Sequence, residues 1–443
     1  NGLVLFSTSA RYLRVANDKL DEYSARLFMH RGALAGNASL LDVVERVAPG
    51  VGVSFKGERT ESIAWFDWST LPPGIEELTE AHLDTAEQTL QAAVGRCLRL
   101  MPDCTNNLPL SSGDDSRRIL VELHRRGVRF RAKTVRVLQK ENRDLDARFA
   151  GEMAQRFGFD HEVIELANAE QFGKDDAACR LLFSSELSEH GWIGPLVRGL
   201  GAGQSLVFDG VAGDIFGNTG YARRDLYGLQ GTEDLERVAE LATPDAMSNV
   251  LRPGAWVPLA DVRRHLAKWL EFLPENSNRP DLAFLLIRAR RGTGPCMQQV
   301  LPPGHLAVCP YLDLDHALAT LTVHPLIKLE RTLQARCLQR YWPAYYAVPG
   351  SRRFSPEVPQ QSAEAERNRR VSRIGHLANE AHAGAFASMF ARVRLRNAAV
   401  ATLGGLSEGA LLRSAWWLEP LLTLEGFRGQ RTVCEISDRL QGR

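Results

Sequence analysis

Two short clusters of glycine, serine and aspartate carry the clearest chemistry in this chain of 443 residues. The first follows an apolar run and reads Leu-Ser-Ser-Gly-Asp-Asp-Ser from position 110, and a helical pattern with an apolar face begins directly after it. Such a loop presents backbone N–H groups and the positive end of a helix dipole to an anion. The negative charge of Asp115 is not suited to binding a phosphate directly. It is suited to this loop if a Mg²⁺ lies between its carboxylate and the phosphate oxygens.

The second cluster has the same layout. An apolar run of strand length, residues 205–208, ends in Asp-Gly-Val-Ala-Gly-Asp at 209–214. Between the clusters, residues 128–137 and 161–166 have strand character, and residues 144–157 carry apolar residues at helical spacing. Strands that alternate with helices predict a parallel sheet covered by helices. Ligands bind such open sheets at the carboxyl ends of the strands, so both aspartate loops are expected there.

The first loop resembles the pyrophosphate loop Ser-Gly-Gly-x-Asp-Ser of the ATP pyrophosphatases, in the form that the asparagine synthetase family uses. Ser111, Gly113, Asp115 and Ser116 match the motif, while Ser112 stands where the family has its first glycine. A helix cap built from aspartate and serine is the alternative interpretation of these residues.

The second loop resembles the family's Gly-x-Gly-x-Asp-Glu-Leu-Phe-Gly-Gly-Tyr. Gly210, Gly213 and Asp214 match, and Ile215 replaces the family's glutamate. The resemblance implies that Asp115 and Asp214 hold the Mg²⁺, and that both loops and the second strand bind the ATP. The nucleotide-binding residues that it implies are Leu110, Ser111, Ser112, Gly113, Asp115, Ser116, Val135, Gly210 and Gly213.

A later segment, Val-Cys-Pro-Tyr-Leu-Asp at 308–313, resembles the family's Arg-Val-Pro-Phe-Leu-Asp. At two positions just before this motif the family has charged residues, whereas this chain has Leu306 and Val308. This difference favours an acceptor other than aspartate. The family's late lysine, which neutralises charge in the transition state, is also missing. Arg352 or Arg353 is expected to supply a fixed positive charge instead. Surface-exposed basic residues are the alternative interpretation of this pair.

The resemblance implies an α/β fold with a parallel sheet of the adenine-nucleotide α-hydrolase (ATP pyrophosphatase) type. Residues 1–74 are expected to be a small β-rich remnant of a glutaminase-like domain, and residues 75–354 the synthetase domain. Residues 355–443 are expected to form a mobile linker and a helical C-terminal segment. A glutaminase of this kind needs a cysteine at its mature N-terminus, whereas this chain begins with Asn1. A missing or separate glutaminase portion is therefore an expected partner.

The composition fits this interpretation without naming a substrate. A net charge of +1 argues against a nucleic-acid-binding protein, and seven scattered cysteines indicate reduced thiols. No apolar run is long enough to span a membrane. We expect a cytoplasmic enzyme with neither nucleic-acid nor membrane partners.

The chemistry that the resemblance implies is adenylation of a substrate carboxylate, with ATP and Mg²⁺ required and pyrophosphate released. The acyl group then passes to ammonia or an amine. The carboxylate would belong to a small molecule or a peptide, since relatives close peptide macrocycles or β-lactam rings or amidate sugar acids. Two alternatives stay open. One is a thiolase-like RNA-modifying enzyme on the same fold, which the near-zero net charge disfavours. The other is a catalytically inactive homologue that acts as a scaffold.

Overall fold

The structure is a computed structural model, and it describes most of the chain up to Gly350. The described residues are 6, 13, 21–31, 34, 36–56, 59–136, 144–165, 192–221, 224–228, 231, 233–243, 257–293, 296–329 and 332–350. The expected C-terminal segment, residues 355–443, lies outside them, as do Arg352 and Arg353.

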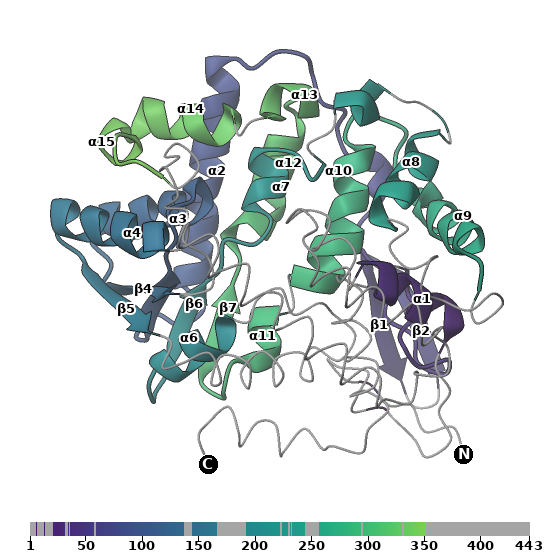
Figure 1. The fold of residues 1–443 in the computed structure, drawn as a ribbon, viewed down its shortest axis with the longest axis horizontal. Coiled ribbons are helices and arrows are strands. Elements are labelled where there is room, and N and C mark those ends of the chain that lie inside the picture. The colour runs from purple at the N-terminus through teal and green to yellow at the C-terminus, as the bar shows by residue number, and fades with distance from the viewer. Residues whose placement is uncertain are drawn as a thin grey trace, which may run out of the picture.

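A five-stranded sheet in the order β5-β4-β3-β6-β7 lies in the left part of the molecule as drawn in Figure 1. Every neighbouring pair in it runs parallel. The predicted α/β fold with a parallel sheet is therefore confirmed. All four residues of β6 are buried, the continuous apolar run that is typical of a parallel strand covered on both faces. The strands are β3 (Thr105–Pro109), β4 (Phe130–Arg136), β5 (Asp160–Glu165), β6 (Ser205–Phe208) and β7 (His305–Val308).

Helices cover both faces of the sheet. On one face, buried side chains of α2, α3 and α4 pack against β3, β4 and β6 in the main hydrophobic core. On the other face, α6 and α11 pack against β6 and β7 in a smaller cluster. The helices of these two layers are α2 (Glu80–Leu98), α3 (Asp114–Arg125), α4 (Asp144–Phe157), α6 (Ile193–Gly199) and α11 (Cys296–Val300).

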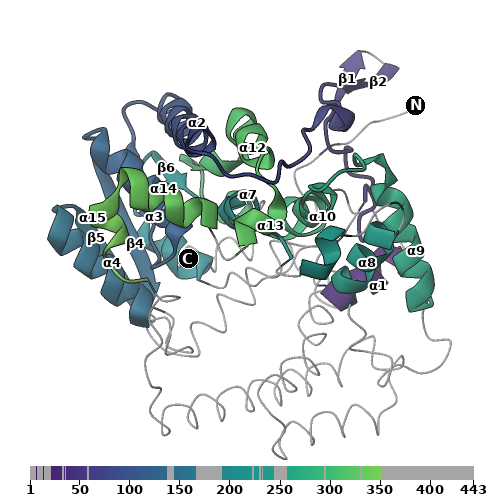
Figure 2. The ribbon, with the colours of Figure 1, turned by 90° about the horizontal axis from the view of Figure 1, so that it is seen from above.

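A second group of helices lies beside and beyond the sheet. The α12 and α14 helices pack on α2, and α15 follows α14. The α8, α9 and α10 helices form a separate stack on the other side of the molecule (Figure 2). The helices outside the sheet layers are α1 (Glu22–Arg31), α7 (Gly213–Gly217), α8 (Glu233–Ala242), α9 (Leu259–Trp269), α10 (Arg279–Phe284), α12 (Leu314–Leu321), α13 (Pro325–Lys328), α14 (Thr332–Tyr341) and α15 (Pro343–Tyr346). Shorter or wider turns are η2 (Trp68–Thr70), η4 (Arg224–Gly228), η5 (Leu270–Phe272), η6 (Leu285–Thr293) and η7 (Pro310–Leu312).

The N-terminal region contributes one antiparallel hairpin, β1 (Val51–Lys56) with β2 (Arg59–Ala64). It stands out from the helical layers in Figure 2, and every residue of β2 is exposed. After the hairpin the chain runs through Pro72 and Gly74 to α2. Ser277 and Asn278 hold this connection in place: the Gly74 N–H donates to the Ser277 hydroxyl at 2.9 Å, and the Asn278 amide donates to the Pro72 carbonyl at 2.9 Å. Among the described residues, no helix combines the length and apolar character that crossing a membrane requires.

Candidate nucleotide site

The two predicted aspartate loops meet at the carboxyl edge of the sheet. The first loop follows β3 and leads into α3, and the second follows β6 and leads into α7. Because β3 and β6 are hydrogen-bonded neighbours, the two loops emerge side by side. Gly213 lies directly against Asp115: a Cβ at Gly213 would stand 2.8 Å from both the Cβ and the Cγ of Asp115. The sequence placed both loops at this edge, and the structure brings them into contact.

The first loop is organised by its own serines. Ser111 and Ser116 face each other, with 3.1 Å between their hydroxyl oxygens, and the Gly113 N–H donates to the Ser111 hydroxyl at 3.2 Å. Leu110 precedes them and is fixed to β4 by its N–H and its carbonyl. The cap position of α3 is Gly113, and no side chain caps the helix from that position.

Asp146 of α4 bonds Ser112, the residue at which this loop departs from the Ser-Gly-Gly-x-Asp-Ser motif. The Ser112 N–H donates to Asp146 Oδ1 at 2.9 Å, and the Ser112 hydroxyl bonds the same oxygen. A glycine at this position would lose the second bond. Sequence reasoning missed Asp146, because nothing in a helical repeat shows which carboxylate reaches a loop 34 residues earlier.

Buried Arg117 ties the first loop to the end of the described chain. Its guanidinium donates to the carbonyls of Ser112 at 3.2 Å, Val348 at 2.6 Å and Pro349 at 3.1 Å. Gly350 lies so close that a Cβ there would be 2.7 Å from the Ser112 carbonyl oxygen. Residues 348–350, the last that the structure describes, therefore pack against the first loop.

The second loop contains a strained residue at its turn. Ala212 has a φ of 68°, and it is the one non-glycine residue with positive φ in the described part of the chain. Counted back from Asp214, the second glycine of Gly-x-Gly-x-Asp falls on Ala212 rather than on Gly213. An alanine in this left-handed conformation costs about 1–2 kcal/mol, which a glycine would not. This turn delivers Asp214, which is exposed, into the first turn of α7.

Tyr311 and Gln334 support Asp115, and the sequence did not single out either of them for a role. The buried Tyr311 hydroxyl donates to the Asp115 backbone carbonyl at 2.8 Å, and the Gln334 amide donates to Asp115 Oδ1 at 2.8 Å. Burial raises the pKa of Tyr311, which keeps its hydroxyl protonated as a donor. Tyr311 lies within the sequence motif around Pro310, so the motif could have drawn attention to it. Gln334 lies on an ordinary amphipathic helix, whose pattern does not distinguish it from other polar residues.

Asp313, the other polar residue of that motif, has a structural role. Arg96 donates to it at 2.7 Å, and its side chain caps α12 by accepting from the Asp315 N–H. Just before this motif, Leu306 is exposed and Val308 is buried. Val135 packs with the cluster under α6, on the face of the sheet opposite α3.

One further carboxylate at this edge titrates abnormally. Burial raises the pKa of Asp209 from 3.8 to about 6, although backbone N–H groups of Val211 and Gly210 oppose the shift. Asp209 directly follows β6, and its Oδ1 accepts from the Val211 N–H at 3.1 Å. The start of the second loop therefore holds a carboxylate whose pKa lies well above the ordinary aspartate range.

The donor set at this edge suits a hard cation held only partly by protein. Within the described ranges, no group of three or more histidine, cysteine, aspartate or glutamate residues stands ready to hold a metal. Asp115 and Asp214 would provide two carboxylates, and phosphate oxygens and water the remaining positions. This is the usual way in which Mg²⁺ binds together with a nucleotide, so the residues present fit that ion.

Comparisons with known proteins do not assign a family. No protein-family description matches the chain, and no curated protein matches it. Among solved structures, the chain is similar to the U34-tRNA thiolase NcsA from Methanococcus maripaludis, determined with its [4Fe-4S] cluster. That similarity has a TM-score of 0.23 and 9% sequence identity, and it covers 63% of this chain and 84% of the other. A likeness of this degree identifies neither a family nor an activity.

Proposed function

We propose that this protein is an ATP-dependent carbon–nitrogen ligase. It would adenylate a substrate carboxylate, release pyrophosphate, and transfer the acyl group to ammonia or an amine. The observation that supports it best is the contact between two aspartate loops at the carboxyl edge of a parallel sheet, with Gly213 against Asp115. The choice of amide formation among adenylating reactions rests on the sequence resemblance to asparagine synthetases.

The residues of the first loop account for nucleotide binding. The N-terminus of α3, with no side-chain cap at Gly113, presents N–H groups and a positive dipole end to the phosphates. The hydroxyls of Ser111 and Ser116 would hold the pyrophosphate as it leaves. Asp115 and Asp214 would bind a Mg²⁺, which supplies positive charge to the phosphate oxygens. The protein's own contribution would be to position the carboxylate for attack on the α-phosphate.

The charge that faces the transition state would come from Arg352 or Arg353, in place of a lysine. The supporting observation is that Gly350, two residues before Arg352, lies against the Ser112 carbonyl. The uncharged Leu306 and Val308 support a carboxylate other than aspartate, such as that of a peptide or a sugar acid. Asp209, with its raised pKa, would accept a proton from the attacking amine more readily than an ordinary aspartate.

An inactive scaffold is the second candidate, and one observation favours it. Asp146 already places a carboxylate on the Ser112 N–H and hydroxyl, which are groups of the phosphate loop. If the loop never exchanges this internal anion for a phosphate, the protein would not bind ATP.

The deciding experiment is product analysis of ATP turnover with Mg²⁺ and ammonia, over a panel of aspartate, peptides and sugar acids. We expect AMP and pyrophosphate with at least one carboxylate, and no pyrophosphate release from Asp115→Ala or Asp214→Ala. Asp261→Ala, which removes a carboxylate from the surface of α9, is the matched control and should keep full turnover. Unchanged turnover in Asp115→Ala would refute the site, and no ATP binding by the unaltered protein would favour the scaffold.

A further inference from the structure

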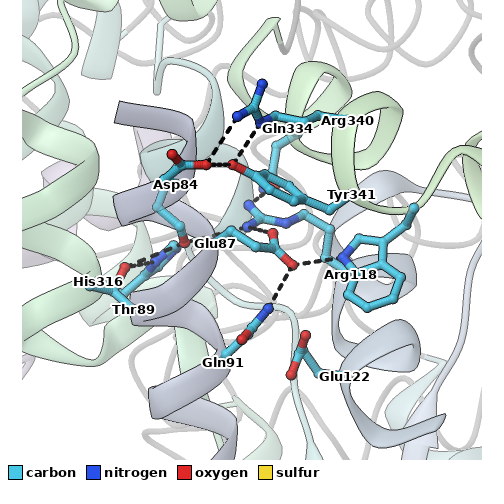
Figure 3. A network of polar contacts seen from close by, with 12 residues as sticks. Asp84, Glu87, Thr89, Gln91, Arg118, Glu122, His316, Gln334, Arg340 and Tyr341 are labelled. Carbon is cyan, nitrogen blue, oxygen red and sulfur yellow. Dashed lines mark hydrogen bonds and ion pairs between the residues drawn. The ribbon is translucent and has the colours of Figure 1, made fainter. Parts of the chain in front are cut away.

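A chain of buried polar contacts runs from α2 through α3 to Gln334 of α14 (Figure 3), and from Gln334 it continues to both aspartate loops. Glu87 of α2 pairs with Arg118 of α3 at 2.9 Å. Arg118 donates to the Gln334 carbonyl oxygen Oε1 at 2.6 Å. The Gln334 nitrogen Nε2 donates to Asp115 Oδ1 at 2.8 Å and to the Gly213 carbonyl at 3.0 Å. Glu87, Arg118 and Gln334 are each at most 3% exposed, so water does not compete for these contacts.

The network leaves the Gln334 amide only one orientation. A guanidinium has donors and no acceptor, so the group that faces Arg118 must be the amide oxygen. The NH₂ group then points at two acceptors, a carboxylate oxygen and a backbone carbonyl. Arg118 is itself held by Glu87, which also accepts from the Trp342 indole at 2.7 Å. The amide is therefore pre-organised to donate toward the loops.

Gln334 joins the two loops through a single atom. Nε2 contacts the side chain of the first loop and the main chain of the second. Gly217, at the end of α7, has no room for a Cβ because the Gln334 side chain occupies that space. The same side chain thus fills the gap between α7 and Asp115 and donates to the groups on either side of it.

We propose that Gln334 is a positioning residue that clamps the Asp115 loop against the Asp214 loop. By fixing the Asp115 carboxylate beside the turn that carries Asp214, it would set the affinity of the site for a Mg²⁺–nucleotide. This role rests on the proposed function for its ligand, whereas the clamp itself rests on the contacts of Gln334 alone.

Two substitutions distinguish the effect of the hydrogen bonds of Gln334 from the effect of its side-chain packing. Gln334→Glu keeps an acceptor for Arg118 and nearly the same shape, but removes both donations to the loops. Gln334→Met keeps the side-chain length and removes every hydrogen bond. Thr89→Val is the control, because it breaks a contact to His316 between α2 and α12 that touches neither aspartate loop.

The first measurement is hydrogen exchange in the full chain without ligand. We expect faster exchange at residues 110–116 and 210–217 in both Gln334 variants, and no change there in Thr89→Val. The second is calorimetric titration with ATP, with and without Mg²⁺. We expect affinity to fall about tenfold in Mg²⁺, which is about 1.4 kcal/mol, and much less in its absence.

The outcomes distinguish the two proposals. Unchanged exchange at both loops in both variants would overturn the clamp. A second outcome is faster exchange with a loss of ATP affinity that is equal with and without Mg²⁺. It would overturn the role of Gln334 in positioning the metal ligand and leave it only a structural role. If the unaltered protein binds no ATP while the variants loosen both loops, the proposed function fails and the clamp stands.

Discussion

Gly213→Ala tests the contact that brings the two aspartate loops together. A methyl group at position 213 would lie 2.8 Å from the Asp115 Cβ, 2.8 Å from its Cγ and 3.0 Å from Oδ1. Two of these are atoms close to the main chain, which cannot swing aside as the end of a long side chain does. Either Asp115 or the second loop must move.

The size of the effect follows from these distances. Carbon atoms pack best at about 3.5–4.0 Å, so the new methyl group is too close by about 0.7 Å or more. Overpacking of this kind costs about 1–3 kcal/mol. Gly213 begins α7, and the better helix propensity of alanine returns up to about 1 kcal/mol. We therefore expect a net loss of about 1–2 kcal/mol in the free energy of unfolding.

The second loop contains its own control. A Cβ at Gly210 would stand 3.6 Å from the Asp115 Cβ and 3.8 Å from the Ser116 nitrogen, which are ordinary van der Waals distances. Gly210→Ala should therefore change the free energy of unfolding by less than about 0.5 kcal/mol.

Urea denaturation of the three proteins, followed by fluorescence and circular dichroism, measures the difference. Titration of each with ATP and Mg²⁺ then shows whether the movement reaches the site, where we expect weaker binding in Gly213→Ala. Equal stability of the two variants would refute the close approach of Gly213 to Asp115, and with it the geometry on which the site is built.

Two further predictions concern buried polar groups at the same edge. Asp209 has a folded-state pKa of about 6 against 3.8 unfolded, so the folded state loses stability as pH rises from about 4 to about 6 and recovers none above it. The Asp209→Asn variant should be about 3 kcal/mol more stable than the unaltered protein at pH 8 and equal to it at about pH 3, because each pKa unit corresponds to about 1.4 kcal/mol. Urea titrations at both pH values measure the gain, and a gain that is the same at both would contradict this origin. Tyr311→Phe removes the hydroxyl that donates to the Asp115 carbonyl and should cost about 0.5–1.5 kcal/mol in thermal or urea unfolding, which is the usual net contribution of one hydrogen bond. Unfolding that matches the unaltered protein would show that this bond contributes nothing to the fold.

The periodicity of apolar residues in the sequence was sufficient to predict a parallel sheet covered by helices. Short apolar runs at 108–110 and 205–208, with helical spacing between them, predicted parallel strands, and the small polar residues after each run marked where the loops leave the sheet. These signals are local, because strand and helix periodicity is carried by neighbouring residues. The same signals predict that Asp115 and Asp214 lie at one edge of the sheet.

The hydrogen bonds that hold the site in place come from residues that are distant in the sequence. Gln334 reaches Asp115 across 219 positions, and Arg117 reaches Pro349 across 232. The Asp146 carboxylate accepts a hydrogen bond from Ser112, and the sequence pattern of its helix, α4, shows only which face is apolar. Sequence periodicity reports which face of a helix is buried, but not which polar group on a neighbouring element it meets.

The sequence by itself thus determined the sheet, the two loops and the acids that they carry. The tertiary structure alone decided how those acids are held: the order of strands made β3 and β6 neighbours, and the packing of α14 on α2 put an amide between their loops. The physical reason is that periodicity arises within one element, whereas hydrogen bonds between buried side chains exist only after distant elements pack and exclude water.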